Sequence, residues 1–167
     1  MLLNDRASVT PDLEYQVLIY RGNGHYHEKQ FRLAAKSFDA ALRMRKAMGR
    51  FRNHLNTTLE CSGGDMFSEE EVRYRLAICL RELGEQNVAI STLQALPAKQ
   101  RSPKLNMLLA KLLHHGRASN TNEAIASYKE VLRDDPLALD AIDGLLLLGV
   151  DGIEVNSLVV NCKLCSE

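Results

Sequence analysis

The chain has 167 residues, of which 46% are hydrophobic and 25% are charged, a composition typical of a globular protein with one continuous core. Lys and Arg number 21 and balance 21 Asp and Glu, so no net charge favours binding to nucleic acid or to an anionic membrane. The apolar run 145–148 is far too short to cross a bilayer, and the first residues lack the pattern of a secretory signal, so we expect an intracellular protein.

The first predicted elements form a helical hairpin over about residues 15–48. Thr10 followed by Pro11 is typical of an N-cap and first helical residue. A helix through Gly22 then leads to a second helix, in which Phe31 and Phe38 take packing positions. Lys29 stands where the turn between such helices usually has glycine.

A polar segment separates this hairpin from the next. Residues 49–67 contain three glycines and several Asn, Ser and Thr residues. Such a composition does not support regular packing, so we expect a surface loop there.

The rest of the chain repeats the hairpin pattern at a period of about 34 residues. A second repeat is predicted at about 69–98, with Ser68 and Glu71 as a capping box and Gly84 in its turn. A third repeat is predicted at about 102–136, with Ser102 and Asn120 as N-caps, and a partial fourth at about 137–161.

These signals predict an all-α fold, a single tetratricopeptide-repeat superhelix (α-solenoid) of three to four helical hairpins. Small and large apolar residues at fixed positions of the repeat are expected to be buried between helices. They are Ala34, Phe38, Ala77, Leu80, Ala89, Leu93, Ala110, Leu113, Ala124 and Tyr128. At the end of the chain, apolar residues are expected to lack a following repeat to cover them: Leu145, Leu148, Ile153, Leu158 and Val159.

Candidate catalytic and metal-binding residues are few, and we expect neither an enzyme nor a cofactor or metal site. Cys162 and Cys165 have the spacing of half a zinc site, but no second such pair follows. The adjacent His114 and His115 would point in different directions from one helix. His25 and His27 fit a helix C-terminus, where the helix dipole favours an imidazolium.

The four cysteines and a basic cluster each leave two interpretations. Cys61, Cys79, Cys162 and Cys165 could pair, but without a secretory signal we expect free thiols. Arg43, Arg45, Lys46, Arg50 and Arg52 could contact nucleic acid, whereas we expect a solvated helix end and no nucleic-acid partner.

Several strings that the repeat itself does not demand resemble the N-terminal repeat region of subunit 7 of the anaphase-promoting complex. They are Tyr-Gln-Val-Leu-Ile-Tyr at 15–20, Ser-Pro-Lys-Leu-Asn-Met-Leu-Leu-Ala at 102–110, Ser-Tyr-Lys-Glu-Val-Leu-Arg at 127–133 and most of 136–146. The resemblance covers about nine-tenths of the chain. It implies a non-catalytic scaffold of a cell-cycle ubiquitin ligase, present in nucleus and cytoplasm.

The resemblance also implies partners: a second copy of the chain, bound through the first repeat, and other repeat subunits of the complex. The candidate dimer contacts are Leu13, Val17, Ile19 and Tyr20. An alternative is a stand-alone adaptor that binds a short peptide of a client protein in a concave groove. Asn23, Arg75, Ile78 and Lys104 are the candidate groove residues. Only two of the five positions that hold a C-terminal carboxylate in chaperone adaptors have suitable donors, which disfavours that form of the alternative.

Overall fold

The computed structural model describes residues 10–55, 68–116 and 120–160, with only the backbone for residues 50–55. Within these ranges the chain forms eight α-helices and one short 3₁₀ helix, and no strand. The predicted all-α fold of helical repeats is therefore confirmed. The chain divides into two compact units, Met1–Glu85 and Gln86–Glu167. The single repeat domain remains a prediction.

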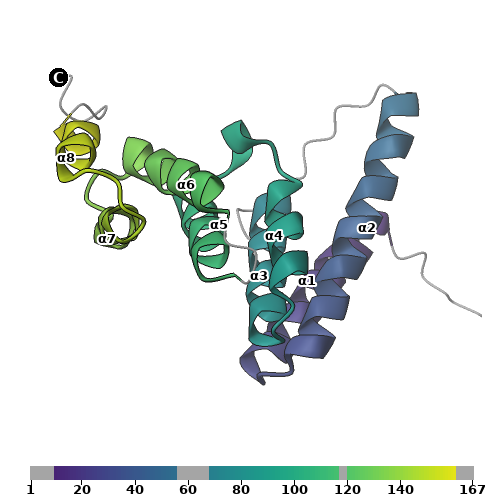
Figure 1. Cartoon of the computed structure of the whole chain (residues 1–167). Helices are drawn as coiled ribbons and strands as arrows, with labels where there is room; N and C mark the ends of the chain where they lie inside the picture. Colours follow the sequence, from purple (N-terminus) through teal and green to yellow (C-terminus); the bar gives the residue numbers. More distant parts are fainter. Residues whose placement is uncertain (1–9, 56–67, 117–119, 161–167) are drawn as a thin grey trace, which may run out of the picture. The chain divides into compact units, whose positions relative to one another are not determined.

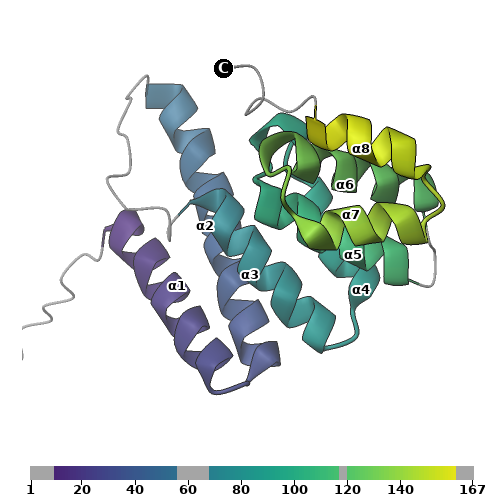
Figure 2. The same cartoon turned by 90° about the vertical axis from the view of Figure 1, so that its left-hand side faces the viewer.

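The first unit contains α1 (Pro11–His27), α2 (Phe31–Leu55) and α3 (Glu69–Glu82). Helices α1 and α2 lie side by side as a hairpin, and α3 packs on α2 (Figures 1 and 2). The start of α1 is as predicted, because the Thr10 hydroxyl accepts a hydrogen bond from the Leu13 amide at 3.4 Å and Pro11 opens the helix. The turn between α1 and α2 places Lys29 at φ 58°, a left-handed conformation that glycine adopts without steric cost.

Helix α2 corrects the predicted start of the loop at residue 49. The helix continues through Gly49 to Leu55, while the remainder of the predicted loop, 56–67, lies outside the described residues. The physical reason is that one glycine costs a helix only about 1 kcal/mol, and no proline follows to end it.

Helix α3 begins and ends where the sequence predicts. Ser68 caps it by accepting a hydrogen bond from the Glu71 amide at 3.1 Å. Gly84 follows the helix at φ 77°, the left-handed conformation expected of a glycine in that turn.

The second unit contains α4 (Gln86–Gln94), the 3₁₀ helix η2 (Ala98–Gln100), α5 (Pro103–His115), α6 (Thr121–Asp134), α7 (Leu139–Leu147) and α8 (Gly152–Val160). Asn120 caps α6 as predicted, accepting from the Glu123 amide at 3.4 Å. Ser102 occupies the N-cap of α5 as predicted, although its side chain makes no capping hydrogen bond. Pro103, which lacks an amide hydrogen, already reduces the number of amides that need a cap.

The core of the second unit forms around Tyr128 on α6. Val131, Leu132, Ala141 and Val155 join it, so that residues of α6, α7 and α8 share one apolar cluster. A Cβ atom at Gly144 would lie 2.5 Å from the Tyr128 ring, and the absence of that atom lets α7 approach α6 closely.

The predicted core is confirmed in both units, since each of the ten residues expected to be buried is at most 7% exposed. At the end of the chain the prediction is wrong for Leu145, which is fully buried in the Tyr128 cluster. Leu148 and Leu158 also pack against that cluster, whereas Ile153 is 79% exposed.

Candidate protein-interaction surfaces

Helix α1 has apolar residues on two opposite sides. Tyr15, Ile19 and Gly22, spaced four and three residues apart, form its buried side. Leu13, Val17 and Tyr20 have the same spacing and lie about half a turn away, where they are 51%, 52% and 57% exposed. We call these last three residues the outer row of α1.

The outer row contains three of the four predicted dimer contacts. Ile19 must be removed from that set, because its side chain is fully buried and has no exposed surface for a partner. The residue types alone could not exclude Ile19, because the residues at positions 13, 17, 19 and 20 are all apolar. Only the packing of α1 against α2 decides which of them is buried.

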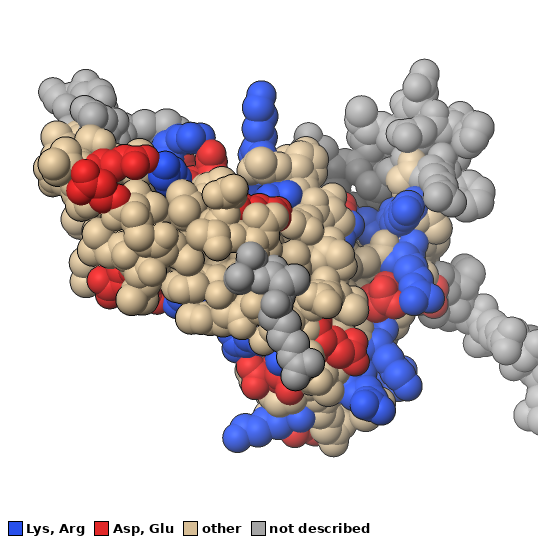
Figure 3. All heavy atoms as spheres, in the orientation of Figure 1, with Lys and Arg blue, Asp and Glu red and all other residues tan. Residues whose placement is uncertain are grey.

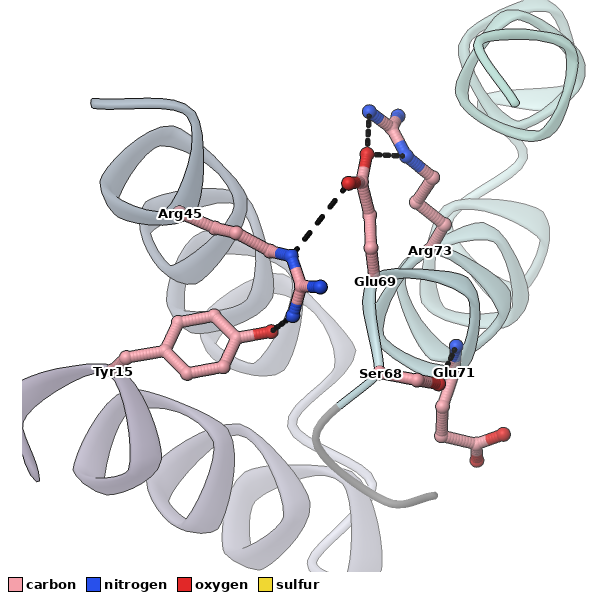
Figure 4. A network of polar contacts seen from close by, with 6 residues as sticks. All are labelled: Tyr15, Arg45, Ser68, Glu69, Glu71 and Arg73. Carbon is pink, nitrogen blue, oxygen red and sulfur yellow. Dashed lines mark hydrogen bonds and ion pairs between the residues drawn. The ribbon is translucent and has the colours of Figure 1, made fainter. Parts of the chain in front are cut away.

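A polar network joins the three helices of the first unit (Figure 4). Arg45 on α2 donates to the Tyr15 hydroxyl of α1 at 3.4 Å, and its Nε lies 3.7 Å from Oε2 of Glu69 at the start of α3. Oε1 of Glu69 accepts from Nε and Nη2 of Arg73 at 2.9 and 2.7 Å. The Arg45 guanidinium also lies 5.9 Å from the centre of the Tyr15 ring, within the range of a cation–π contact.

The candidate groove residues divide between the two units. Arg75 on α3 donates through Nε to Glu71 at 2.8 Å, and through Nη1 to the side-chain oxygen of Asn23 on α1. The structure thus brings Asn23 and Arg75 together, as a link between α1 and α3. Ile78 is half-buried on α3, and Lys104 is exposed at the start of α5 in the second unit.

The chain is 38% identical over 162 residues to anaphase-promoting complex subunit 7 of Homo sapiens, a match that covers 95% of this chain. The proteins of the same name from Mus musculus and Arabidopsis thaliana are 38% and 31% identical, over 95% and 90% of the chain. This chain is a relative of anaphase-promoting complex subunit 7. The resemblance noted in the sequence is thereby confirmed.

The match to subunit 7 covers only part of each relative. The chain spans 28% of the length of the human, mouse and Arabidopsis proteins. No protein-family model matches the chain. The sequence match therefore concerns one region of subunit 7, and the residues discussed above are the part of that region that the structure describes.

In this relative of subunit 7, the histidines and cysteines singled out in the sequence make ordinary contacts or lie outside the described ranges. Nδ1 of His25 lies 3.0 Å from the side-chain oxygen of Gln30. The rings of His114 and His115 stack at 4.5 Å, so the expectation that they point in different directions is wrong. Cys79 is a buried free thiol, whose pKa is raised by burial, and further by Glu82, to about 11. In the described part of the chain, no three His, Cys, Asp or Glu side chains lie together as metal ligands, and no helix is both long and apolar enough to span a bilayer.

The sequence did not predict the polar network that Arg45 and Glu69 form in this relative of subunit 7. Arg45 stood out only as one member of a basic cluster, and Glu69 did not stand out. Their pairing depends on how α3 packs against α2, a contact between two separate helices. No local sequence pattern predicts that contact. Two surface ion pairs, Lys111–Asp140 between α5 and α7 and Lys129–Glu154 between α6 and α8, each at 2.5 Å, also join residues distant in sequence and were missed for the same reason.

Proposed function

We propose that the chain acts as a non-catalytic scaffold subunit of an anaphase-promoting complex, the cell-cycle ubiquitin ligase after which its relatives are named. The observation that carries this proposal is the 38% identity to human subunit 7 over 162 residues. The fold supports it, because repeated helical hairpins present broad side-chain surfaces of the kind that bind other proteins. Such a subunit would bind other repeat subunits of the complex and would work in nucleus and cytoplasm.

The same proposal includes a homodimer formed through the outer row of α1. Leu13, Val17 and Tyr20 are each more than half exposed although they are large and apolar, and they lie in one line along the helix. Exposed apolar surface of this kind commonly marks a contact with another protein. Two α1 helices that met through this row would bury it without disturbing Tyr15 or Ile19 on the inner side.

The adaptor alternative has less support from the geometry. A peptide carboxylate needs cationic donors that are free to turn toward it. The Arg75 guanidinium is already bound by Glu71 and Asn23, which ties it to the hairpin. A peptide would have to displace those contacts, and their loss would offset part of the binding energy.

Affinity purification of the tagged chain from dividing cells tests the scaffold proposal. A scaffold should co-purify with subunits of the complex in near-equal amounts, whereas an adaptor should yield varied clients in small amounts. Recovery of no subunit of the complex, from a chain shown to be folded, would overturn the scaffold proposal. Light scattering on the purified chain tests the dimer separately, and a monomer mass at tens of micromolar would overturn it.

A further inference from the structure

The outward side of α2 carries a row of basic side chains. The buried residues of this helix, which include Ala34, Phe38 and Ala41, lie on its opposite side. Arg32, Lys36, Arg43 and Lys46 are exposed, and their spacing of four, seven and three residues places them along one side of the helix. Figure 3 shows several Lys and Arg side chains, with a few Asp and Glu side chains among them, along the right-hand edge of the molecule, where Figure 1 places α2.

This side of α2 is positively charged although the whole chain is neutral. Between Phe31 and Gly49 the helix carries five Lys and Arg residues and one acidic residue, Asp39. Asp39 pairs with Arg43 at 2.5 Å, but the Arg43 side chain is 80% exposed, so water screens that pair. No carboxylate within the described ranges pairs with Arg32, Lys36 or Lys46. Most of this positive charge is therefore left for a partner to neutralise.

A row of apolar side chains runs beside the basic one. Leu33, Ala40 and Ala47 are seven residues apart, which aligns them along the helix. Leu33 is 44% exposed and Ala47 is exposed as well. The two alanines are small enough for the backbone of another helix to come close, and a seven-residue repeat is the spacing at which two helices stay in register. We call the basic and apolar rows together the α2 ridge.

We propose that the α2 ridge binds an acidic amphipathic helix of a partner protein. The apolar row of that helix would pack on Leu33, Ala40 and Ala47, and its Glu or Asp residues would pair with Arg32, Lys36 and Lys46. This is recognition of a helix by an apolar seam with charged flanks. The surface differs from the outer row of α1, so that a dimer through α1 would leave the ridge free for this partner.

A protein helix fits the ridge better than nucleic acid does. The apolar row offers nothing to a phosphate, and neither row contains an aromatic side chain on which a base could stack. A peptide helix can use both rows at once.

The proposal is tested with the purified chain and a synthetic probe in fluorescence anisotropy. The probe is a fluorescein-labelled helical peptide of three heptads, with Leu in one row and Glu on both flanks. The same peptide with Lys in place of Glu is the control probe. We expect the acidic peptide alone to bind, and to bind more weakly as salt rises, because salt screens the ion pairs. Duplex DNA of similar charge is measured in parallel.

Substitutions in the α2 ridge test the contributions of its basic row and its apolar row to peptide binding one at a time. Lys36→Glu with Arg43→Glu should weaken peptide binding about fivefold or more, and Leu33→Asp should weaken it through the apolar row. Arg133→Glu, a charge reversal at a side chain that is 61% exposed on α6, should leave binding unchanged. If a charge-reversal variant melts early, Lys36→Gln with Arg43→Gln takes its place.

Three results would overturn the proposal. One is no binding of the acidic peptide at about 200 μM in low salt. Another is equal binding by wild type and by the Lys36→Glu, Arg43→Glu variant. The third is tighter binding of the DNA duplex than of the peptide, lost in the same variant, which would make the ridge a nucleic-acid surface.

Discussion

Gly22 on α1 lies directly against the ring of Phe38 on α2, where a Cβ atom would come within 2.6 Å of Cε1. Phe38 is fully buried, so its ring has no open space to move into. The close approach of these two residues sets the distance between the helices of the first hairpin.

Replacing Gly22 with Ala should therefore destabilise the protein, by about 1–3 kcal/mol, because the added methyl overpacks the hairpin. Gly24 is the matched control, since it lies on the same helix and a Cβ there would meet nothing within 4 Å. Gly24→Ala should stabilise the protein by about 0.5–1 kcal/mol through helix propensity. Chemical denaturation of both variants gives the two values, and equal effects would show that Gly22 is not a packing position.

The turn residue Lys29 offers a second test. Its φ of 58° is unfavourable for a side chain with a Cβ, so Lys29→Gly should raise the free energy of unfolding by about 0.5–1 kcal/mol. Lys36→Gly, in the second turn of α2, should lower the free energy of unfolding by about 1 kcal/mol, because glycine there only weakens the helix. A loss of stability in both variants would contradict the left-handed turn.

Much of this fold follows from the sequence, and the reasons differ from residue to residue. Thr10, Ser68, Asn120 and Gly84 act through hydrogen bonds or backbone angles within a few residues, so local patterns predict them. The buried positions follow from the repeat, because each repeat packs the same small and large residues.

Contacts between elements distant in sequence could not be predicted in this way. Whether Ile19 faces inward and Val17 outward depends on which side of α1 meets α2. Leu145 is buried in one cluster with Tyr128 and Val155. Its position in the sequence does not predict this contact. The end of α2 was missed because Gly49 weakens a helix without ending it.

Arg45 should matter more to stability than its neighbour Arg43. Arg45→Ala removes the contacts with Tyr15 and Glu69 and should cost about 1–2 kcal/mol, which combines a charge-assisted hydrogen bond and a cation–π contact. Arg43→Ala, at a side chain that is 80% exposed, should cost less than about 0.5 kcal/mol. Urea denaturation measures both losses, and a smaller loss for Arg45 would argue against the network in Figure 4.

Cys79 makes stability depend on pH in the alkaline range. Burial raises the pKa of its thiol from an ordinary value of 9.0 to about 11, so the folded state holds the proton more tightly than the unfolded state does. This contribution to stability is complete below about pH 9 and is lost as the pH rises toward 11. Wild type should therefore lose stability relative to Cys79→Ala between these values, and parallel pH profiles of the two proteins would contradict the assignment.

A charge in the outer row of α1 should weaken the proposed dimer. Val17→Asp places a carboxylate at a position that is 52% exposed, so the monomer should fold normally while the contact between copies is lost. Val88→Asp on α4 is a close control, because Val88 is 49% exposed. Light scattering should show a monomer for Val17→Asp and a dimer for Val88→Asp. Dissociation by Val88→Asp, with Val17→Asp still dimeric, would place the contact in the second unit.

The ion pair between Arg45 and Glu69 has a consequence for residues 56–67, which join α2 to α3. Helices α2 and α3 contact each other directly, through their packing and through that pair. The entropy cost of joining two packed helices grows slowly with the number of residues between them, by about 0.6 kcal/mol for each doubling. The chain can therefore gain or lose residues at this point with little effect on the hairpins. We expect an epitope or a fluorescent label inserted between α2 and α3 to leave the packing of the two helices intact.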